Sequence, residues 1–398
     1  YRFISMSSLQ KAVLTSKIPP RPVLAQRGAA RRSSLGRHKS RDHEDYTPVQ
    51  WNKYFKESQD VKVGTDMFRV YSIGDDGPVL VLLHGGGFSA LTWSVLSKML
   101  VDMAELRIIA MDLRGHGDTM TSNDTDLSID TLTGDVINVI NSLYGDDTPP
   151  LVVMGHSMGG AVAVNVASSE RCPASLVGVA VIDVVEGTAL SALASMQSFL
   201  RGRPQSFNSV EDAIRWSLQN GQLRNVESAK VSMAGQLKNA QTGTPATAEL
   251  EEHKTVEASA SQDLPELDNN AIREDEEATF KVPGVGRGQY TWRIDLRATE
   301  PHWSGWFQGL SQKFLSARAA RLLLLASLDR LDTDLTIGQM QGKFEMHTFD
   351  STHNRCGHAV HEDLPADVAN VVSAFLIRNK FTQSKDSEYR FNHSMPAC

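Results

Sequence analysis

Short apolar runs alternate with longer amphipathic stretches along the chain from about residue 60 onward. Some runs, such as residues 79–83, are apolar at every position, which is typical of strands buried on both faces of a parallel sheet. This alternation predicts a single α/β domain in which helices cover both faces of a mostly parallel sheet. The predicted strands are residues 67–73, 79–85, 107–113, 151–156, 176–184, 321–328 and 343–349. Helices are predicted at 128–145 and 364–379.

The composition is that of a globular protein. The 398 residues with 41% hydrophobic content can form a large core. There is no run of about 18 apolar residues and no apolar signal-like segment, so we expect neither membrane spanning nor secretion. The three cysteines are widely spaced, which argues against a disulfide framework and fits a reducing compartment. We therefore expect the protein in the cytoplasm, the nucleus or both.

The strand and helix alternation is interrupted between two predicted sheet strands. Residues 187–316 show mainly helical patterns, among them "SVEDAIRW", in which Ser209 is a candidate N-cap with Asp212 three residues later. An insertion at this place in an α/β domain is where a lid over an active site would lie. We therefore predict a core formed by residues 46–186 and 317–381, with a helical lid between them.

Two segments have a strong charge bias. Residues 1–41 contain ten Lys or Arg and no acid, whereas residues 249–281 contain eleven acids against three basic residues. Neither has enough apolar content to offset its ordering entropy, so we expect a disordered tail over 1–45, a disordered insert over about 241–286 and a C-terminal tail over 382–398. A short basic tail on an acidic body favours a solvated tail or a localisation signal over nucleic-acid binding. The acidic insert is either a tolerated surface loop or a docking segment.

The stretch "VVMGHSMGG" places Ser157 between two glycines at the end of a predicted strand. The residues that follow, "MGGAVAVNVASS", have the small side chains that let a helix pack closely against a strand. A serine in a strand–turn–helix context of this kind is typical of a nucleophile elbow. The alternative is a small residue in an ordinary glycine-rich turn, and the context favours the nucleophile.

Three glycines follow the predicted strand at 79–85 in "LLHGGGFSALTW". Backbone N–H groups of Gly86 and Gly87, together with that of Met158, are the candidate donors of an oxyanion hole. The alternative, a phosphate-binding loop, lacks the Lys and Ser/Thr of a P-loop. The residues predicted to line the substrate pocket are His84, Phe88, Trp93 and Asp329.

A serine nucleophile needs a base and an acid that orients the base. His358 in "CGHAVHED" follows the last predicted strand and is the favoured base, with His361 as its nearest rival. The acid has two sources in the required chain order, one at the end of "VAVIDV" and one after "LLLLASL". The candidates are Asp183 at the first, and Asp329, Asp332 and Asp334 at the second.

Longer runs of the sequence resemble the protein phosphatase methylesterases, which are serine hydrolases of the α/β-hydrolase fold. The runs are "GHSMGG", "IDVVEGTA", "RGRPQSF", "DRLDTDLTIGQMQGKF" and "CGHAVHED", and the resemblance extends from about residue 16 to about 380. It implies that Asp183 completes a triad with Ser157 and His358, and that Asp329 and Asp332 belong to a structural or substrate-shaping strand end. The chain departs from the family pattern at Phe88 and Gly115, where a histidine and a serine are expected.

The resemblance also implies an activity. The family removes the methyl ester from the C-terminal leucine of the catalytic subunit of protein phosphatase 2A, with no metal or organic cofactor. That subunit is therefore the expected partner, and nucleic acid and membrane are not. The alternatives are a general carboxylesterase of small esters and a mainly non-catalytic phosphatase-binding protein.

Overall fold

A computed structural model of the chain describes residues 45–252, 289–327, 331–349 and 356–386. Most of the basic tail, most of the acidic insert and most of the C-terminal tail lie outside these ranges. No helix in the described ranges has both the length and the apolar character needed to cross a bilayer.

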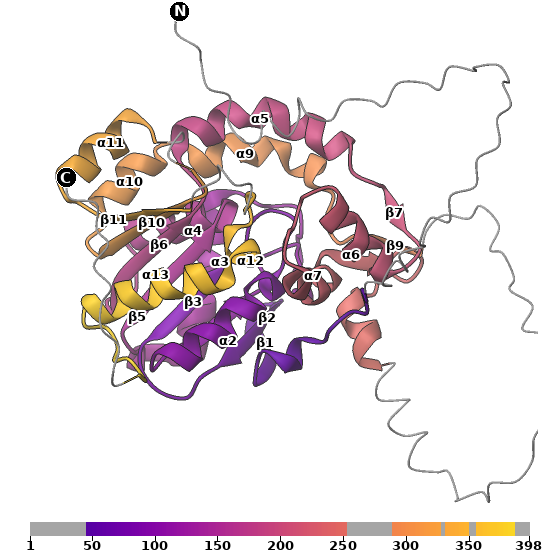
Figure 1. Ribbon diagram of the computed structural model, residues 1–398, viewed down its shortest axis with the longest axis horizontal. Helices are drawn as coiled ribbons and strands as arrows, with labels where there is room; N and C mark the ends of the chain where they lie inside the picture. Colours follow the sequence, from indigo (N-terminus) through magenta and orange to yellow (C-terminus); the bar gives the residue numbers. More distant parts are fainter. Residues whose placement is uncertain (1–44, 253–288, 328–330, 350–355, 387–398) are drawn as a thin grey trace, which may run out of the picture.

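An eight-stranded sheet forms the centre of the molecule (Figure 1). Strands β1 and β2 are antiparallel to their neighbours, and the other six strands run parallel. The strands, in their order across the sheet, are β1 (Glu57–Val63), β2 (Asp66–Ile73), β4 (Arg107–Met111), β3 (Val79–Leu83), β5 (Leu151–His156), β6 (Leu176–Ile182), β10 (Ala320–Leu325) and β11 (Glu345–Thr348). The predicted α/β class and mostly parallel sheet are confirmed. Of these eight strands, only β1 was not predicted, because it is an edge strand with a single buried residue, Val61, and so lacks an apolar run.

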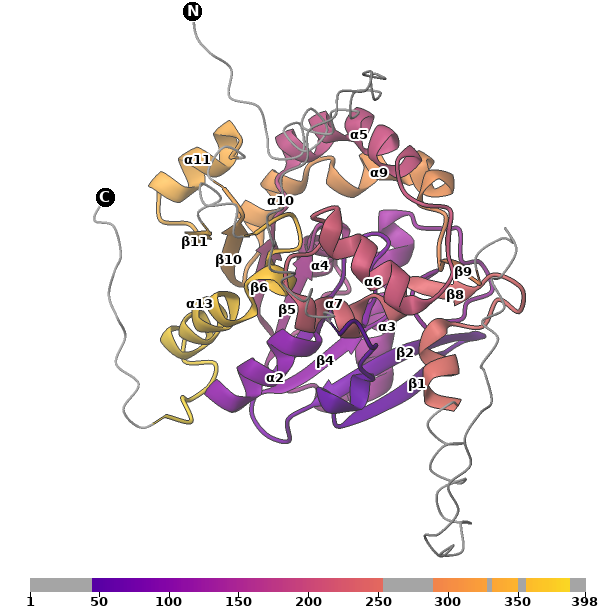
Figure 2. The same ribbon diagram turned by 45° about the vertical axis from the view of Figure 1, so that its right-hand side comes forward.

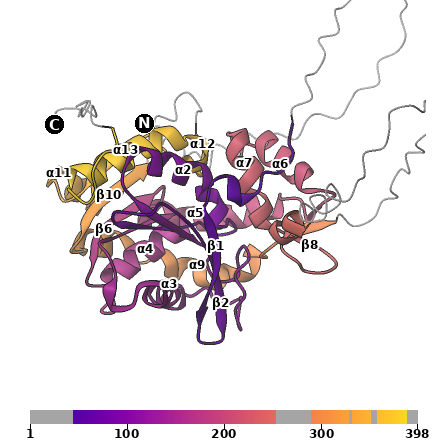
Figure 3. The same cartoon turned by 90° about the horizontal axis from the view of Figure 1, so that it is seen from below.

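Helices cover both faces of this sheet, as Figure 3 shows from below. Successive side chains of a strand point to opposite faces, so β3 sends Val79, Val81 and Leu83 into the core under helices α3 (Ile129–Tyr144) and α4 (Met158–Ser168). The alternate residues, Leu80 and Leu82, enter the second core, under α2 (Ser94–Met103) and α13 (Pro365–Arg378). Burial on both sides explains why this strand has no polar residue.

The segment between β6 and β10 is an insertion that extends above and beside the sheet (Figures 1 and 2). Ser209 caps helix α6 by accepting a hydrogen bond from the Asp212 N–H, as predicted. Besides helices, the insertion contains three short strands that were not predicted, which form an antiparallel sheet in the order β7-β9-β8. The elements are α5 (Glu186–Arg201), β7 (Ser206–Phe207), α6 (Val210–Gln219), α7 (Val226–Ser232), β8 (Leu237–Asn239), β9 (Tyr290–Trp292), α9 (Glu300–Phe307) and α10 (Leu310–Ser316).

The remaining elements are short connections and helices. They are the 3-10 turns η1 (Trp51–Lys53), η2 (Ala90–Trp93), η3 (Gly145–Asp147), η4 (Ala234–Gln236) and η5 (Leu296–Thr299), and the helices α11 (Thr333–Met340) and α12 (Val360–Asp363).

Two predicted boundaries of the insertion differ from the structure. Residues 246–252, assigned to the disordered insert, are helical and attached to the core, since the Thr247 hydroxyl donates to Asp118 and the Trp51 indole N–H to Glu251. Trp303 and Phe314, assigned to the lid, are buried in the same core as residues of α3 and α4. The acidic composition hid the first boundary because Glu249 and Glu251 are half-buried and accept hydrogen bonds from distant segments, which the sequence pattern does not reveal.

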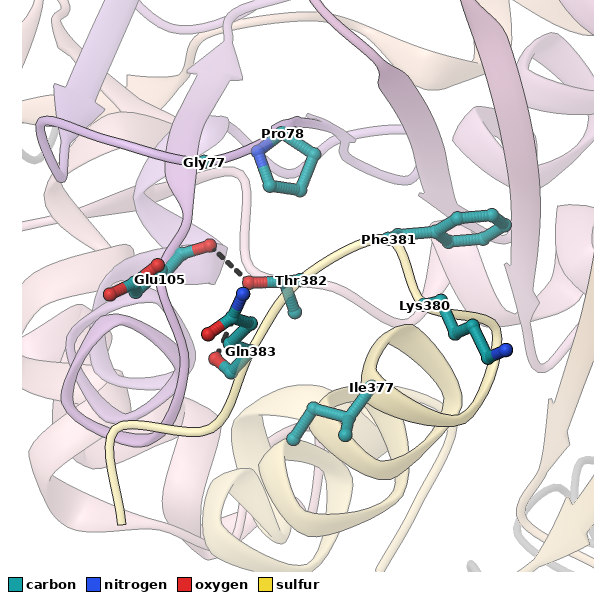
Figure 4. Close-up of a pocket in the computed structure, with 8 residues that line it drawn as sticks. All are labelled: Gly77, Pro78, Glu105, Ile377, Lys380, Phe381, Thr382 and Gln383. Carbon is teal, nitrogen blue, oxygen red and sulfur yellow. Dashed lines mark hydrogen bonds between the residues drawn. The ribbon is translucent and has the colours of Figure 1, made fainter. Parts of the chain in front are cut away.

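The predicted C-terminal tail also begins later than residue 382. Thr382 donates its hydroxyl hydrogen to the Glu105 carbonyl, and the Lys385 N–H donates to the Met103 carbonyl. A surface pocket of about 390 Å³ is bordered by Thr382, Glu105, Pro78 and the end of α13 (Figure 4). Pro78 and Glu105 precede β3 and β4, so this pocket lies at the amino ends of the parallel strands, the opposite edge from Ser157.

Candidate active site

Ser157 is the residue between strand β5 and helix α4, in the turn that the sequence predicts. Its φ is 53° and its ψ is −119°, a backbone conformation that residues other than glycine rarely adopt. Its N–H donates to the Ile182 carbonyl at 3.0 Å, which fixes the turn against the end of strand β6. The half-buried serine therefore sits at the start of a helix, where negative charge is favoured.

The glycines on both sides of Ser157 have steric reasons to lack a side chain. A Cβ on Gly155 would lie 2.0 Å from the Gly159 carbonyl oxygen, and one on Gly159 would lie 2.2 Å from the Leu83 carbonyl oxygen. Neither distance is compatible with a side chain. The motif thus permits close packing of α4 on β3 and β5.

Asp183 and His358 are in contact, although 175 positions separate them in the chain. The His358 Nδ1 lies 2.8 Å from Asp183 Oδ2, and Asp183 Oδ1 accepts the Ala326 N–H at 3.0 Å. Asp183 follows strand β6 with a φ of 54°, and its side chain is fully buried. A buried carboxylate held in this way fixes the imidazole orientation and leaves Nε2 as the nitrogen available for chemistry.

Ser157 and His358 both lie in the described ranges, and no hydrogen bond joins the serine hydroxyl to the imidazole. The His358 side chain is 35% exposed, so the imidazole borders solvent on the side away from Asp183. Catalytic hydrogen bonds are often long in substrate-free enzymes and tighten when substrate binds. The structure thus brings the acid and the base together and places the serine close by.

The glycine loop after β3 lies beside Ser157, since a Cβ on Gly85 would be 3.3 Å from the Ser157 Cβ. The Gly87 N–H donates to His116 Nε2 at 2.9 Å, so this predicted oxyanion donor is already engaged. Burial lowers the pKa of His116 to about 4, which keeps its imidazole neutral and able to accept. The Gly86 N–H donates to no described group, and the Met158 N–H is the first of helix α4 and has no intrahelical partner. Gly86 and Met158 are the remaining donors.

Of the four residues predicted to line the pocket, two are in the interior. His84 and Trp93 are both 0% exposed, so they support the site from below and do not line it. His84 Nε2 accepts the Leu113 N–H, and burial holds its pKa well below the usual value. Phe88 is half-buried, with its ring perpendicular to that of His156 at a centroid distance of 5.5 Å, and it packs against apolar residues of the insertion. Asp329 lies outside the described residues.

The loop that carries His358 is held by a second buried acid, which sequence reasoning missed. Asp363 accepts hydrogen bonds from the Gly357 N–H at 2.6 Å and from the Arg224 N–H at 2.8 Å, and pairs with the Arg224 guanidinium at 3.2 Å. Burial raises the pKa of Asp363, and these hydrogen bonds oppose that rise. Asp363 thus connects the base loop to the insertion. The only signal in the sequence is the acid pair that follows His361.

His361 and Glu362 extend the same support into the interior. His361 Nε2 lies 2.8 Å from the Thr92 hydroxyl, and its ring stacks on Trp93 at a centroid distance of 4.2 Å. Thr92 and Ser232 donate to the two carboxyl oxygens of Glu362 at 2.5 and 2.6 Å. Burial raises the pKa of Glu362 to about 8. His361 therefore packs behind the site, against Thr92 and Trp93.

The alternative acids that the structure describes have other partners. Asp332 caps α11 by accepting the Leu335 N–H, and it also accepts the Ser311 hydroxyl hydrogen. Asp334 pairs with Gln312 on the surface. Within the described ranges, no cluster of three or more His, Cys, Asp or Glu residues is arranged to hold a metal ion.

Comparison with known proteins agrees with this arrangement. The sequence model of the Alpha/beta hydrolase family matches residues 80–371, which is more than half of the chain. Protein phosphatase methylesterase 1 of Bos taurus is 49% identical over 389 residues, covering 95% of this chain and 98% of that protein. Probable protein phosphatase methylesterase 1 of Caenorhabditis elegans is 38% identical over 379 residues, covering 95% of this chain and 87% of that protein.

Solved structures share the fold at low sequence identity. E-2-(Acetamidomethylene)succinate hydrolase superposes with a TM-score of 0.58 at 16% identity, covering 81% of this chain and 99% of that one. An esterase from Mycobacterium tuberculosis superposes with a TM-score of 0.52 at 19% identity, covering 81% of this chain and 92% of that one. The sequence similarity is much more specific, and the chain belongs to the protein phosphatase methylesterase family of α/β hydrolases, as a carboxylic ester hydrolase.

Proposed function

We propose that the protein removes the methyl ester from the C-terminal leucine of the protein phosphatase 2A catalytic subunit. The observation that carries the proposed chemistry is the 2.8 Å contact of buried Asp183 with His358, beside a serine in an elbow turn. The substrate rests on the relatives, which are named protein phosphatase methylesterases.

In the proposed reaction, Ser157 Oγ attacks the ester carbonyl while His358 Nε2 takes its proton. The carbonyl oxygen becomes negative and accepts hydrogen bonds from the N–H groups of Gly86 and Met158. The tetrahedral intermediate collapses when His358 gives its proton to the departing methoxide, so methanol leaves. Water, deprotonated by His358, then attacks the acyl-enzyme, which restores the Ser157 hydroxyl and leaves a free carboxylate on the peptide.

The test is mass spectrometry of the methylated phosphatase C-terminus after incubation with the wild type or Ser157→Ala. We expect loss of the 14 Da methyl increment with the wild type only, and Ser157-dependent labelling by a fluorophosphonate probe. Strong turnover of small aryl esters without demethylation would reject the substrate and favour a general carboxylesterase. Absence of Ser157-dependent labelling would favour a non-catalytic binding protein.

A further inference from the structure

Arg203 lies beside the glycine loop, although it belongs to the insertion. Its guanidinium stacks on the face of Trp292 at 3.5 Å, and its Nη1 is 3.8 Å from the position of a Cβ on Gly87. Trp292 is itself fixed, because its indole N–H donates to the Pro204 carbonyl at 2.7 Å and its ring contacts Phe207. The arginine is therefore held at a defined place next to the glycine loop.

This guanidinium has no acidic partner among the described residues. Its Nε is shielded from solvent and makes no hydrogen bond. Burial lowers the pKa of Arg203 to about 10, so the side chain still carries its charge at neutral pH. Neighbouring arginines of the insertion differ, since Arg224 pairs with Asp363 and Arg293 with Asp124.

Arg203 as a whole is half-buried, and a partly desolvated cation without a counter-ion is stabilised by a ligand that supplies the opposite charge. Stacking on Trp292 covers one face of the guanidinium plane but leaves its edge donors, which suit the two oxygens of a carboxylate. Leu296 lies against the same point of the loop, with its Cδ1 2.6 Å from the Gly87 Cβ position, and supplies an apolar neighbour. The surroundings resemble a binding subsite more than a structural ion pair.

We propose that Arg203 is a substrate-specificity residue that binds a carboxylate of the peptide next to the ester-cleaving centre. This inference rests on the proposed function, because it takes the substrate to be a peptide with a methylated C-terminus. The methyl ester is neutral, so before cleavage the carboxylate belongs to an acidic side chain of the peptide. After cleavage, the newly formed terminal carboxylate is the second source.

The test measures kcat and KM of the full chain on three probes. They are a peptide leucine methyl ester that contains an Asp, the same peptide with Asn in its place, and p-nitrophenyl acetate as a neutral small ester. Arg203→Met removes the charge and keeps a side chain that can pack on Trp292. Arg203→Lys keeps the charge and loses the planar fork. Arg201→Met is the matched control, since Arg201 is exposed, two residues away and bonded only to Ser198 among the described residues.

If the side chain is the ligand, Arg203→Met raises KM for the Asp peptide at least about tenfold, with kcat and p-nitrophenyl acetate turnover close to wild type. The Asn peptide then loses little, Arg203→Lys recovers part of the effect, and Arg201→Met is unchanged. If the product carboxylate is the ligand, Arg203→Met weakens inhibition by the free-acid peptide at least about tenfold, whichever residue stands at the Asp position.

Three results would overturn the proposal. The first is an equal loss of activity on all three probes. The second is no loss on any probe together with unchanged product inhibition, and the third is an equal loss on both peptides with unchanged product inhibition. If Arg203→Met does not fold, Arg203→Lys decides, because it must weaken the Asp peptide or product inhibition selectively. If the wild type cleaves p-nitrophenyl acetate but no peptide ester, the proposed function fails, and inhibition of that turnover by peptide acids still tests Arg203.

Discussion

The serine and the base of the candidate triad are held in different ways. Ser157 and Asp183 each directly follow a strand of the sheet, with φ of 53° and 54°. The N–H of each donates to a carbonyl at the end of the adjacent strand, Ile182 for the serine and Leu324 for the aspartate. His358 lies on a loop held by side chains.

The difference concerns what must be in place before each group is positioned. Backbone sterics and strand pairing place the serine and the acid, so their positions depend on the core alone. His358 depends on three side chains. Asp183 contacts its Nδ1, and Asp363 accepts the N–H of the preceding residue, Gly357. The third is His156, whose Nε2 lies 2.9 Å from the backbone carbonyl oxygen of His358. Asp363 also holds Arg224 of the insertion. The base is thus the member of the triad that the insertion can influence.

The largest expected effect comes from Asp183, which the backbone positions and which in turn orients His358. Asp183→Asn keeps the sheet intact but presents the wrong group to His358 Nδ1, which favours the wrong imidazole tautomer. We expect kcat/KM on an aryl ester to fall by about four orders of magnitude. Asp332→Asn is the control, because Asp332 caps α11 and is expected to keep near-wild-type activity. An equal loss in Asp332→Asn would mean that the acid is misassigned.

On the backbone side, Gly159→Ala tests whether sterics alone position Ser157. The added methyl group would lie 2.2 Å from the Leu83 carbonyl oxygen and 2.4 Å from that of His84, so the backbone must shift. We expect the free energy of unfolding to fall by about 3 kcal/mol or more in urea titrations, with activity lost. Gly305→Ala, in helix α9 with no atom near its added Cβ, should instead gain about 0.5–1 kcal/mol. A Gly159→Ala protein of normal stability and activity would contradict backbone control.

The same difference separates what the sequence could and could not predict. Ser157 was singled out because strand, turn and small residues form a continuous local pattern. The fold class followed from the apolar strands for the same reason. Asp183 was one of four candidate acids in the required chain order, and only the family resemblance selected it. The Gly87 bond to His116 was not foreseen, because it joins two loops through a neutral buried imidazole and leaves no pattern in either segment.

The insertion was predicted less well for a related physical reason. Its small sheet pairs β9, at Tyr290–Trp292, with strands more than 50 residues earlier, and each strand is only two or three residues long. Strands this short have no periodicity to detect. The proposed role of Arg203 could not be predicted from the sequence either, because it rests on the lack of an acidic partner in space among the described residues.

Asp363→Asn tests directly whether side chains hold the loop that carries His358. Asparagine has one acceptor oxygen, so either the Gly357 N–H or the Arg224 N–H faces an amide donor, and the ion pair with Arg224 is lost. We expect kcat to fall about 10- to 100-fold, in line with about 1.5–3 kcal/mol for a hydrogen bond to a charged group. KM on a small ester should change less, because Asp363 positions the base and does not contact substrate. Asp130→Asn, at the exposed start of α3, should match the wild type. Unchanged kcat in Asp363→Asn would show that the loop is held without this carboxylate.

The smallest expected effect, taken per pH unit, is a pH dependence of stability that comes from the residues supporting His358 alone. Burial raises the pKa of Glu362 from 4.5 to about 8, although Ser232 and Thr92 donate to it. Between these values the folded protein keeps a proton that the unfolded chain has released. The free energy of unfolding therefore falls as pH rises, by at most about 1.4 kcal/mol per pH unit from this group. Other titrating groups are common to both proteins, so Glu362→Gln should remove only this contribution and flatten the curve from about pH 5 to pH 8. Urea titrations across that range measure the difference. Parallel curves of unfolding free energy against pH for the two proteins would mean that Glu362 ionises normally. In that case the packing behind His358 would not depend on the proton of Glu362.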